Sequence, residues 1–282
     1  MNLAVAAALF ANLIWGLAPV FAKVGLQNVN EVSFLLLRFF LSTVFLFPSL
    51  RGALKKIPRL PLRTLLLGTL TVAVHYYLQV YALKQAPVTW YVFFYSLCPI
   101  LSLFAVRVRF SWKLFAVCFL AILGTLIFVN LGAHSAVSLQ GLLALGASVV
   151  TWVLFTMAIR EWQKELSDLE ISATTNGLSL LVFATLAPLQ TEPLLTGWNS
   201  QAVTATIALS LLLPLAFWAY SYSLRKAPSM AVLGQYSEPL FGTLGAVMFL
   251  GETLSSQQIW GLTLIAAALT VLVVPLKLKR LW

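Results

Sequence analysis

The segment Ala82-Leu-Lys-Gln-Ala-Pro87, with Tyr95-Ser96 after it, returns 141 residues later as Ser223-Leu-Arg-Lys-Ala-Pro228, with Tyr236-Ser237 after it. Similarity of a chain to itself at a fixed distance indicates that it is built from repeated units. The two segments therefore predict that the chain consists of two related halves.

The composition identifies the surroundings in which these halves fold. The chain has 282 residues, of which 61% are hydrophobic and 9% charged, whereas globular proteins carry about 25% charged residues. So few charges cannot cover a soluble surface, which excludes a soluble enzyme, a disordered chain and a secreted disulfide scaffold. The two cysteines, Cys98 and Cys118, lie in apolar runs and predict no disulfide framework. The sequence therefore predicts an integral membrane protein.

Ten apolar windows have about the 20 residues that a helix needs to cross a bilayer. The charge-free stretch 114–159 is too long for one span, and turn residues at 130–141 divide it in two. The expected fold is all-α, with ten transmembrane helices. Their residue ranges are 3–22, 32–50, 64–83, 85–106, 114 to about 130, about 141 to 159, 171–191, 202–224, 229–250 and 257–276.

Basic residues predict the orientation. With the N-terminus inside, fifteen Lys and Arg residues fall on cytoplasmic segments, and only Lys23 and Lys84 fall on the opposite face. Such an excess of basic residues is typical of the cytoplasmic side. We therefore expect both termini in the cytoplasm and a multi-pass protein of the inner (plasma) membrane of a bacterium. The net charge of +10 is explained by this distribution, and no nucleic-acid partner is expected.

The halves comprise residues 1–130 and 138–282, and Trp15 and Trp152 occupy corresponding places in them. Because five spans is an odd number, the second half enters the membrane from the other side, and the repeat is inverted. Inverted repeats can exchange conformations, which supports alternating access around a site near the midplane. The alternative is a duplication without transport function.

Several short motifs also resemble a known family. In this order, on ten helices in two halves, they resemble the EamA-type branch of the drug/metabolite transporter superfamily. The resemblance implies two five-helix repeats and the export of small metabolites, often amino acids. One departure is Val106-Arg107-Val108-Arg109, where the family often has a Gly-Glu pair. The motifs are Asn12-Leu-Ile-Trp-Gly16, Leu35-Leu-Leu-Arg-Phe39, Ala82-Leu-x-x-Ala-Pro87, Tyr236-Ser-Glu-Pro239 and Leu250-Gly-Glu252.

Arg38 and Glu238 are the formally charged residues within the predicted spans. A charge at the centre of a membrane helix costs about 2.5–3.5 kcal/mol on insertion scales, so such residues usually face the interior. We expect the two either to pair or each to contact one end of a substrate. The alternative is that they only hold helices together.

Polar and aromatic residues within the spans predict a cavity for an amphiphilic solute. His75 could instead join two helices by a hydrogen bond or relay protons. The other aromatic residues at span ends, Tyr91 and Trp162 among them, are expected at the membrane interfaces or in loops. The substrate-binding candidates besides Arg38 and Glu238 are Asn12, Trp15, His75, Gln79, Tyr95, Trp152, Asn176, Trp218, Tyr222 and Tyr236.

Pro99 and Pro239 fall at nearly matching points of the two halves. Proline removes a backbone hydrogen bond from a helix and allows a bend. We therefore expect these two prolines to act as hinges during access switching.

The sequence carries no Walker loop, dinucleotide fingerprint or zinc motif. We predict a non-enzyme without cofactor or metal, driven by proton exchange, solute counter-flow or facilitated flow. Its partners are a small-molecule substrate and membrane lipids. The leading function is export of small metabolites, by resemblance amino acids with aromatic or apolar side chains. The alternatives are an exporter of drugs or other amphiphilic metabolites, a lipid flippase or scramblase, and a receptor or structural membrane protein.

Overall fold

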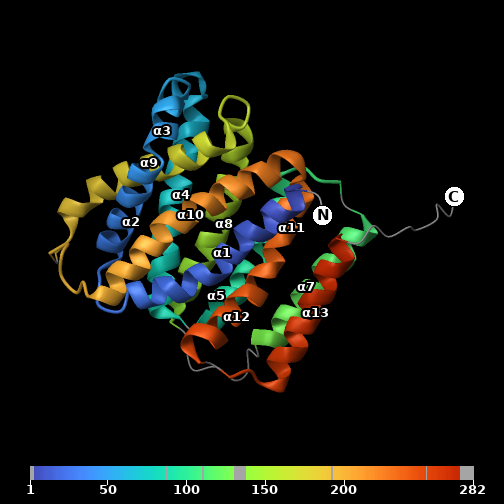
Figure 1. Ribbon diagram of the computed structural model, residues 1–282. Helices are drawn as coiled ribbons and strands as arrows, with labels where there is room; N and C mark the ends of the chain where they lie inside the picture. The colour runs from blue at the N-terminus through green and yellow to red at the C-terminus, as the bar shows by residue number, and fades with distance from the viewer. Residues whose placement is uncertain are drawn as a thin grey trace.

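The computed structural model is all-helical in the part of the chain that it describes (Figure 1). That part comprises residues 3–86, 88–109, 111–129, 138–191, 193–251 and 253–273. The predicted turn is therefore outside the described residues over 130–137, as are the end of the last predicted span, residues 274–276, and the basic tail.

Each half contains long helices and broken ones. A 3-10 turn at Ile57–Arg59 follows the third helix. The first half consists of α1 (Leu3–Gly25), α2 (Glu31–Phe45), α3 (Phe47–Leu54), α4 (Leu62–Gln85), α5 (Val88–Tyr95), α6 (Cys98–Ala105) and α7 (Trp112–Val129). The second half consists of α8 (Leu139–Trp162), α9 (Asp168–Leu186), α10 (Ser200–Lys226), α11 (Pro228–Leu233), the 3-10 turn η3 (Gly234–Ser237), α12 (Glu238–Leu250) and α13 (Ser256–Val273).

Seven helices within the described residues are long and apolar enough to cross a membrane, or eight if α2 and α3, bent by 81°, form one span. The predicted spans 85–106 and 229–250 are both built from shorter helices, α5 with α6 and α11 with η3 and α12. The protein is thus an all-helical, multi-pass membrane protein. The total of ten spans and the cytoplasmic position of both termini stay predictions.

The packing of the helices repeats between the halves. α4 lies along α8 and α1 along α10, while α2 packs against α9 and α7 against α13 (Figure 1). The set of pairs is unchanged when α1 is exchanged with α8, α2 with α9, α4 with α10 and α7 with α13. The contacts of α6 with α8 and of α12 with α1 obey the same exchange. The two halves are therefore related by an approximate twofold axis.

A backbone detail supports the correspondence of the halves. Arg107, just after α6, has a φ of 55°, and Gly251, just after α12, has a φ of 67°. This left-handed region favours glycine. The first half therefore places an arginine in the conformation for which the second half uses the glycine that the family pattern predicts.

The two candidate hinge prolines lie where helices begin. Pro99 lies in the first turn of α6 and Pro239 in the first turn of α12, where proline is tolerated because its missing N–H has no partner in the helix. The chain breaks just before each, at Ser96-Leu97 and at η3. Flexing at these breaks stays a prediction.

Trp162 differs from its predicted place at an interface. It is fully buried between α8 and α4, and its Nε1 donates to the Thr64 carbonyl at 3.3 Å. Gly68 of α4 makes room for it, since a Cβ there would lie 2.3 Å from the tryptophan ring. The close packing of α4 on α8 therefore depends on a glycine opposite a tryptophan.

Candidate functional site

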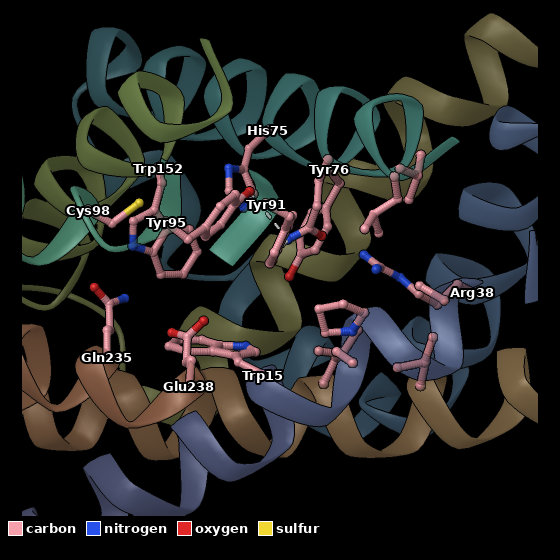
Figure 2. A pocket seen from close by; sticks show the side chains of 18 residues that line it. Trp15, Arg38, His75, Tyr76, Tyr91, Tyr95, Cys98, Trp152, Gln235 and Glu238 are labelled. Carbon is pink, nitrogen blue, oxygen red and sulfur yellow. Dashed lines mark hydrogen bonds between the residues drawn. The ribbon is translucent and has the colours of Figure 1, made fainter. Parts of the chain in front are cut away.

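A central cavity lies between the halves, among α1, α2, α4, α5, the start of α6, α8, α10, η3 and the start of α12 (Figure 2). The lining residues surround about 600 Å³ of space, part of which is open to the outside. Both halves contribute to its wall, as expected for a repeat protein whose site lies on its axis.

Aromatic rings form much of this wall. Trp15 of α1 and its repeat counterpart Trp152 of α8 meet edge to face, with ring centroids 5.1 Å apart. His75 of α4 lies 5.1 Å from Trp152, and Tyr220 of α10, which is buried behind the wall, lies 5.0 Å from Trp15. Such contacts stabilise aromatic pairs by about 0.5–1.5 kcal/mol beyond burial. The rings of the two halves therefore hold each other in place at the centre of the molecule.

Gln79 links two further rings on the α5 side. Its Nε2 donates to the Tyr91 hydroxyl at 2.6 Å and to the Tyr95 hydroxyl at 3.3 Å. The two tyrosines are one turn apart on α5 and stack with centroids 4.1 Å apart. Gln79 thus fixes a flat, polar-edged surface that faces the cavity.

His75 joins α4 to α8. Its Nδ1 lies 2.8 Å from the Ser148 carbonyl, and because a carbonyl can only accept, Nδ1 carries the proton. The structure thus contains the hydrogen bond between helices that was one of the two alternatives for His75. The ring also lines the cavity, so both alternatives remain compatible with its position.

Arg38 and Glu238 both line the cavity, and Figure 2 places them toward different ends of it. The Arg38 guanidinium lies 4.0 Å from the Tyr76 ring centre and 4.2 Å from that of Phe39, in contacts that favour a cation. Neither charge has an ion-pair partner within the described residues. The structure therefore does not pair them, although the sequence left that alternative open.

A wider hollow of about 960 Å³ continues from the cavity and shares Trp15, Tyr91, Tyr95 and Glu238 with it. It extends along α1 to Lys23 and reaches Leu254 and Gln258 at the start of α13. Tyr236 lines this hollow and not the central cavity. The wider hollow thus connects the central cavity with the end of the molecule where α1 ends and α13 begins.

Four of the predicted residues line neither the central cavity nor the wider hollow. Asn12 is fully buried against η3, where a Cβ on Gly234 would lie 3.0 Å from its Nδ2. Asn176 donates to the Ser172 carbonyl of its own helix at 2.8 Å. Trp218 is 42% exposed on the outside of α10, and Tyr222 is half-buried. The face of α10 that turns inward carries Phe217 and Tyr220, one position away from the expected face.

Sequence reasoning missed several lining residues. Tyr91 is 5% exposed and lines the cavity, although its position near the end of a span favoured the interface. Its spacing of four from Tyr95 could have revealed it, because residues i and i+4 share a helix face. Tyr76, Cys98 and Gln235 also line the cavity, and the Gln235 Oε1 has no hydrogen-bond partner within the described residues.

Comparisons with known proteins agree with this architecture. The EamA-like transporter family matches residues 2–130 and again residues 139–274. A solved structure entitled "Crystal structure of protein" is similar with a TM-score of 0.74 and 20% sequence identity, over 95% of this chain and 97% of that one, so the two share a fold. No curated protein matches the chain. Because the family match covers both halves in succession, the chain belongs to the EamA-like transporter family, a group of membrane transporters within the drug/metabolite transporter superfamily.

Proposed function

We propose that this transporter exports small metabolites, foremost amino acids with apolar or aromatic side chains, by alternating access around the central cavity. The observation that carries the proposal is an aromatic cavity in which Arg38 and Glu238 have no ion-pair partner among the described residues. An amino acid carries its carboxylate and its ammonium on one carbon, so it would bring its carboxylate to Arg38 or its ammonium to Glu238, with its side chain against the rings between these two residues.

Burial of the Arg38 and Glu238 charges carries a free-energy cost. An ion away from water is strongly disfavoured unless it is paired, and Arg38 is only 3% exposed. Its planar guanidinium matches a carboxylate with two parallel hydrogen bonds. Bound solute would thus satisfy whichever of the two charges it contacts, and the aromatic rings would select solutes with an apolar body.

Glu238 also suggests that solute transport is coupled to proton movement. If no solute ammonium is present, the carboxylate can be neutralised by a proton, which would then travel against the solute. We therefore propose proton counter-flow through Glu238. Exchange of one solute for another would leave Glu238 occupied by an ammonium throughout and would need no proton.

The membrane topology that accompanies this function is ten spans in two inverted halves, with both termini in the cytoplasm of a bacterium. Reporter fusions at the first and last residues test it. Reporters on opposite sides of the membrane would show that the number of spans is odd and would overturn the inverted arrangement.

Transport itself is tested in proteoliposomes by counter-flow of a panel of radiolabelled amino acids. A fluorescent-lipid flip assay in the same vesicles tests the flippase alternative. Amino-acid counter-flow without lipid movement is the expected result; lipid movement without counter-flow would replace the proposal by a flippase.

Three variants test the roles of the charges: Arg38→Gln, Glu238→Gln and the double variant. Each single change is expected to reduce counter-flow at least tenfold, and the double change to reduce it further. Recovery in the double variant would show that the two residues serve each other and not the solute. Phe104→Leu, at a side chain that is 73% exposed, is the matched control. Under an imposed pH gradient, Glu238→Gln should abolish the response of uptake to the gradient; an unchanged response would exclude proton coupling at this residue.

A further inference from the structure

Each half contains one ion pair that joins the end of its third long helix to the start of its second. In the first half, Lys84 Nζ lies 3.1 Å from Glu31 Oε1. In the second half, Arg225 Nε lies 3.1 Å from Asp168 Oδ1. We refer to these as the two clasps, Lys84–Glu31 and Arg225–Asp168.

The clasps occupy the same places in the repeat. Lys84 and Arg225 are the third residues of the two related segments that begin at Ala82 and Ser223. Glu31 and Asp168 are the first residues of α2 and α9. Each acid directly follows the residue that caps its helix, Asn30 for α2 and Ser167 for α9. The residues of both pairs thus correspond by sequence, and not only by a similar contact.

The correspondence extends to a backbone carbonyl. Lys84 Nζ also donates to the carbonyl of Val29 at 3.0 Å, and Arg225 Nη2 donates to the carbonyl of Leu166 at 2.8 Å. In both halves the accepting residue is buried and stands two positions before the acid. A cation, a carboxylate and a backbone carbonyl therefore come together in the same arrangement in each half.

The second clasp has more contacts. Arg225 Nη1 donates to the Gln163 carbonyl, and Ser221 Oγ donates to Asp168 Oδ1 at 2.8 Å. Arginine can make these bonds together because its five N–H groups are held in a fixed fork, whereas lysine presents one ammonium.

The clasps lie just before the broken helices that line the cavity. After Lys84 the chain enters α5, which carries Tyr91 and Tyr95, and after Arg225 it enters α11 and η3, which lead to Gln235 and Glu238. Each clasp therefore fixes the point from which a cavity-lining segment departs.

Lys84 is a charged residue at a position where basic residues are uncommon. It is one of two basic residues that the sequence places on the face opposite the cytoplasm, where basic residues are depleted. Its ammonium is only partly exposed, with the side chain 33% accessible and that of Glu31 18%. A role in the clasp accounts for a lysine at this position.

We propose that Lys84 and Arg225 are positioning residues that set the pivots of the two broken helices, and that the two clasps bias the transporter toward opposite open states. The proposal rests on the proposed function, because alternating access makes the halves exchange conformations. In an inverted repeat, whatever one clasp does to the outward-open state its counterpart does to the inward-open state.

The experiment measures accessibility and needs no substrate. In a Cys98→Ala, Cys118→Ala background, a reporter is introduced by Thr243→Cys, at a residue that is 8% exposed and lines the wider hollow. The labelling rate with a membrane-impermeant maleimide is measured from the side to which that hollow leads. It is compared for Lys84→Gln, Arg225→Gln and their combination.

The two single variants are expected to change the labelling rate in opposite directions, each by roughly two- to fivefold, which is what one partly exposed ion pair can contribute. The combination should bring the rate back toward that of the parent. The change for Arg225→Gln should be the larger, since that clasp has more contacts. Lys164→Gln, which removes an exposed ion pair with Glu161 at the end of α8, is the matched control and should leave the rate unchanged.

Changes in the same direction, or no change in folded protein, would overturn the proposal. If a neutral variant does not fold, Glu31→Gln and Asp168→Asn replace it, because they leave the cation and its carbonyl contact in place; the same signs are expected. Failure of the amino-acid panel would leave this result intact, because labelling is measured without solute. The two proposals can thus fail separately.

Discussion

A single methyl group at Gly16 is expected to disturb transport without unfolding the protein. Gly16 lies where α1 crosses the start of α12, and a Cβ built there would be 2.7 Å from the carbonyl oxygen of Glu238 and 2.9 Å from Cβ of Phe241. Gly242 faces it, with a Cβ position 2.9 Å from the Gly16 carbonyl. The crossing is therefore close enough that only glycine fits on either side.

The displacement follows from these distances. Ordinary van der Waals contact begins near 3.4 Å, so Gly16→Ala must move the backbone at Glu238 by about 0.7 Å. A hydrogen bond of about 2.9 Å that is lengthened by this amount, to about 3.6 Å, is no longer made. We therefore expect counter-flow in proteoliposomes to fall about tenfold, chiefly through weaker solute binding, because the displaced residue carries the cavity's carboxylate.

The assay pairs counter-flow at several solute concentrations with the melting temperature of the purified protein. Gly146→Ala in α8 is the control, since its Cβ would meet Phe94 at an ordinary 3.5 Å and should leave transport unchanged. The reasoning would be refuted if Gly16→Ala transports at the normal rate, or if Gly146→Ala is equally damaging. Gly16→Ser would clash in the same way, because the clash involves the first side-chain carbon.

Three further changes probe other parts of the molecule. Gln79→Leu removes the donor to both tyrosine hydroxyls and should weaken solute binding several-fold in a counter-flow titration, while the melting temperature changes little. Gly124→Ala places a Cβ 2.7 Å from the Gly261 carbonyl where α7 crosses α13; it should lower the melting temperature by several degrees, and an unchanged value would show that the crossing can widen freely. Trp218→Leu alters an exposed ring outside both hollows and should leave counter-flow normal, so a large loss would restore its predicted binding role.

Much of the fold could be predicted because the decisive features are local. Apolar length, the scarcity of charges and the related segments at Ala82 and Ser223 are visible without any packing information. The position of Trp15 opposite Trp152 also follows from the repeat, since corresponding residues near a twofold axis come close to each other. The breaks before Pro99 and Pro239 could be expected from proline chemistry, although the 3-10 turn before Pro239 could not.

The lining of the cavity was harder to predict, for a physical reason. In a membrane the outside of a helix is as apolar as its buried face, so hydrophobic periodicity does not show which face turns inward. On α10 the inward face carries Phe217 and Tyr220, and Trp218 instead points outward. The polar residue Asn176 bonds within its own helix. A polar or aromatic residue in a span is therefore a weak guide to the cavity unless a second residue on the same face supports it.

The repeat also indicates where the cavity should open in its other state. The wider hollow runs along Pro19 and Lys23 of α1, and at the spacing of the two central tryptophans their counterparts in α8 are Thr156 and Arg160. That end is now closed: Thr156 is fully buried, and Arg160 donates to the Leu224 carbonyl at 3.1 Å. If the halves exchange conformations, the surface beside Thr156 must open as the hollow beside Pro19 closes. A thiol introduced by Thr156→Cys should then label faster whenever a thiol in the wider hollow labels more slowly. Rates that rise and fall together would show that the two positions belong to one continuous channel.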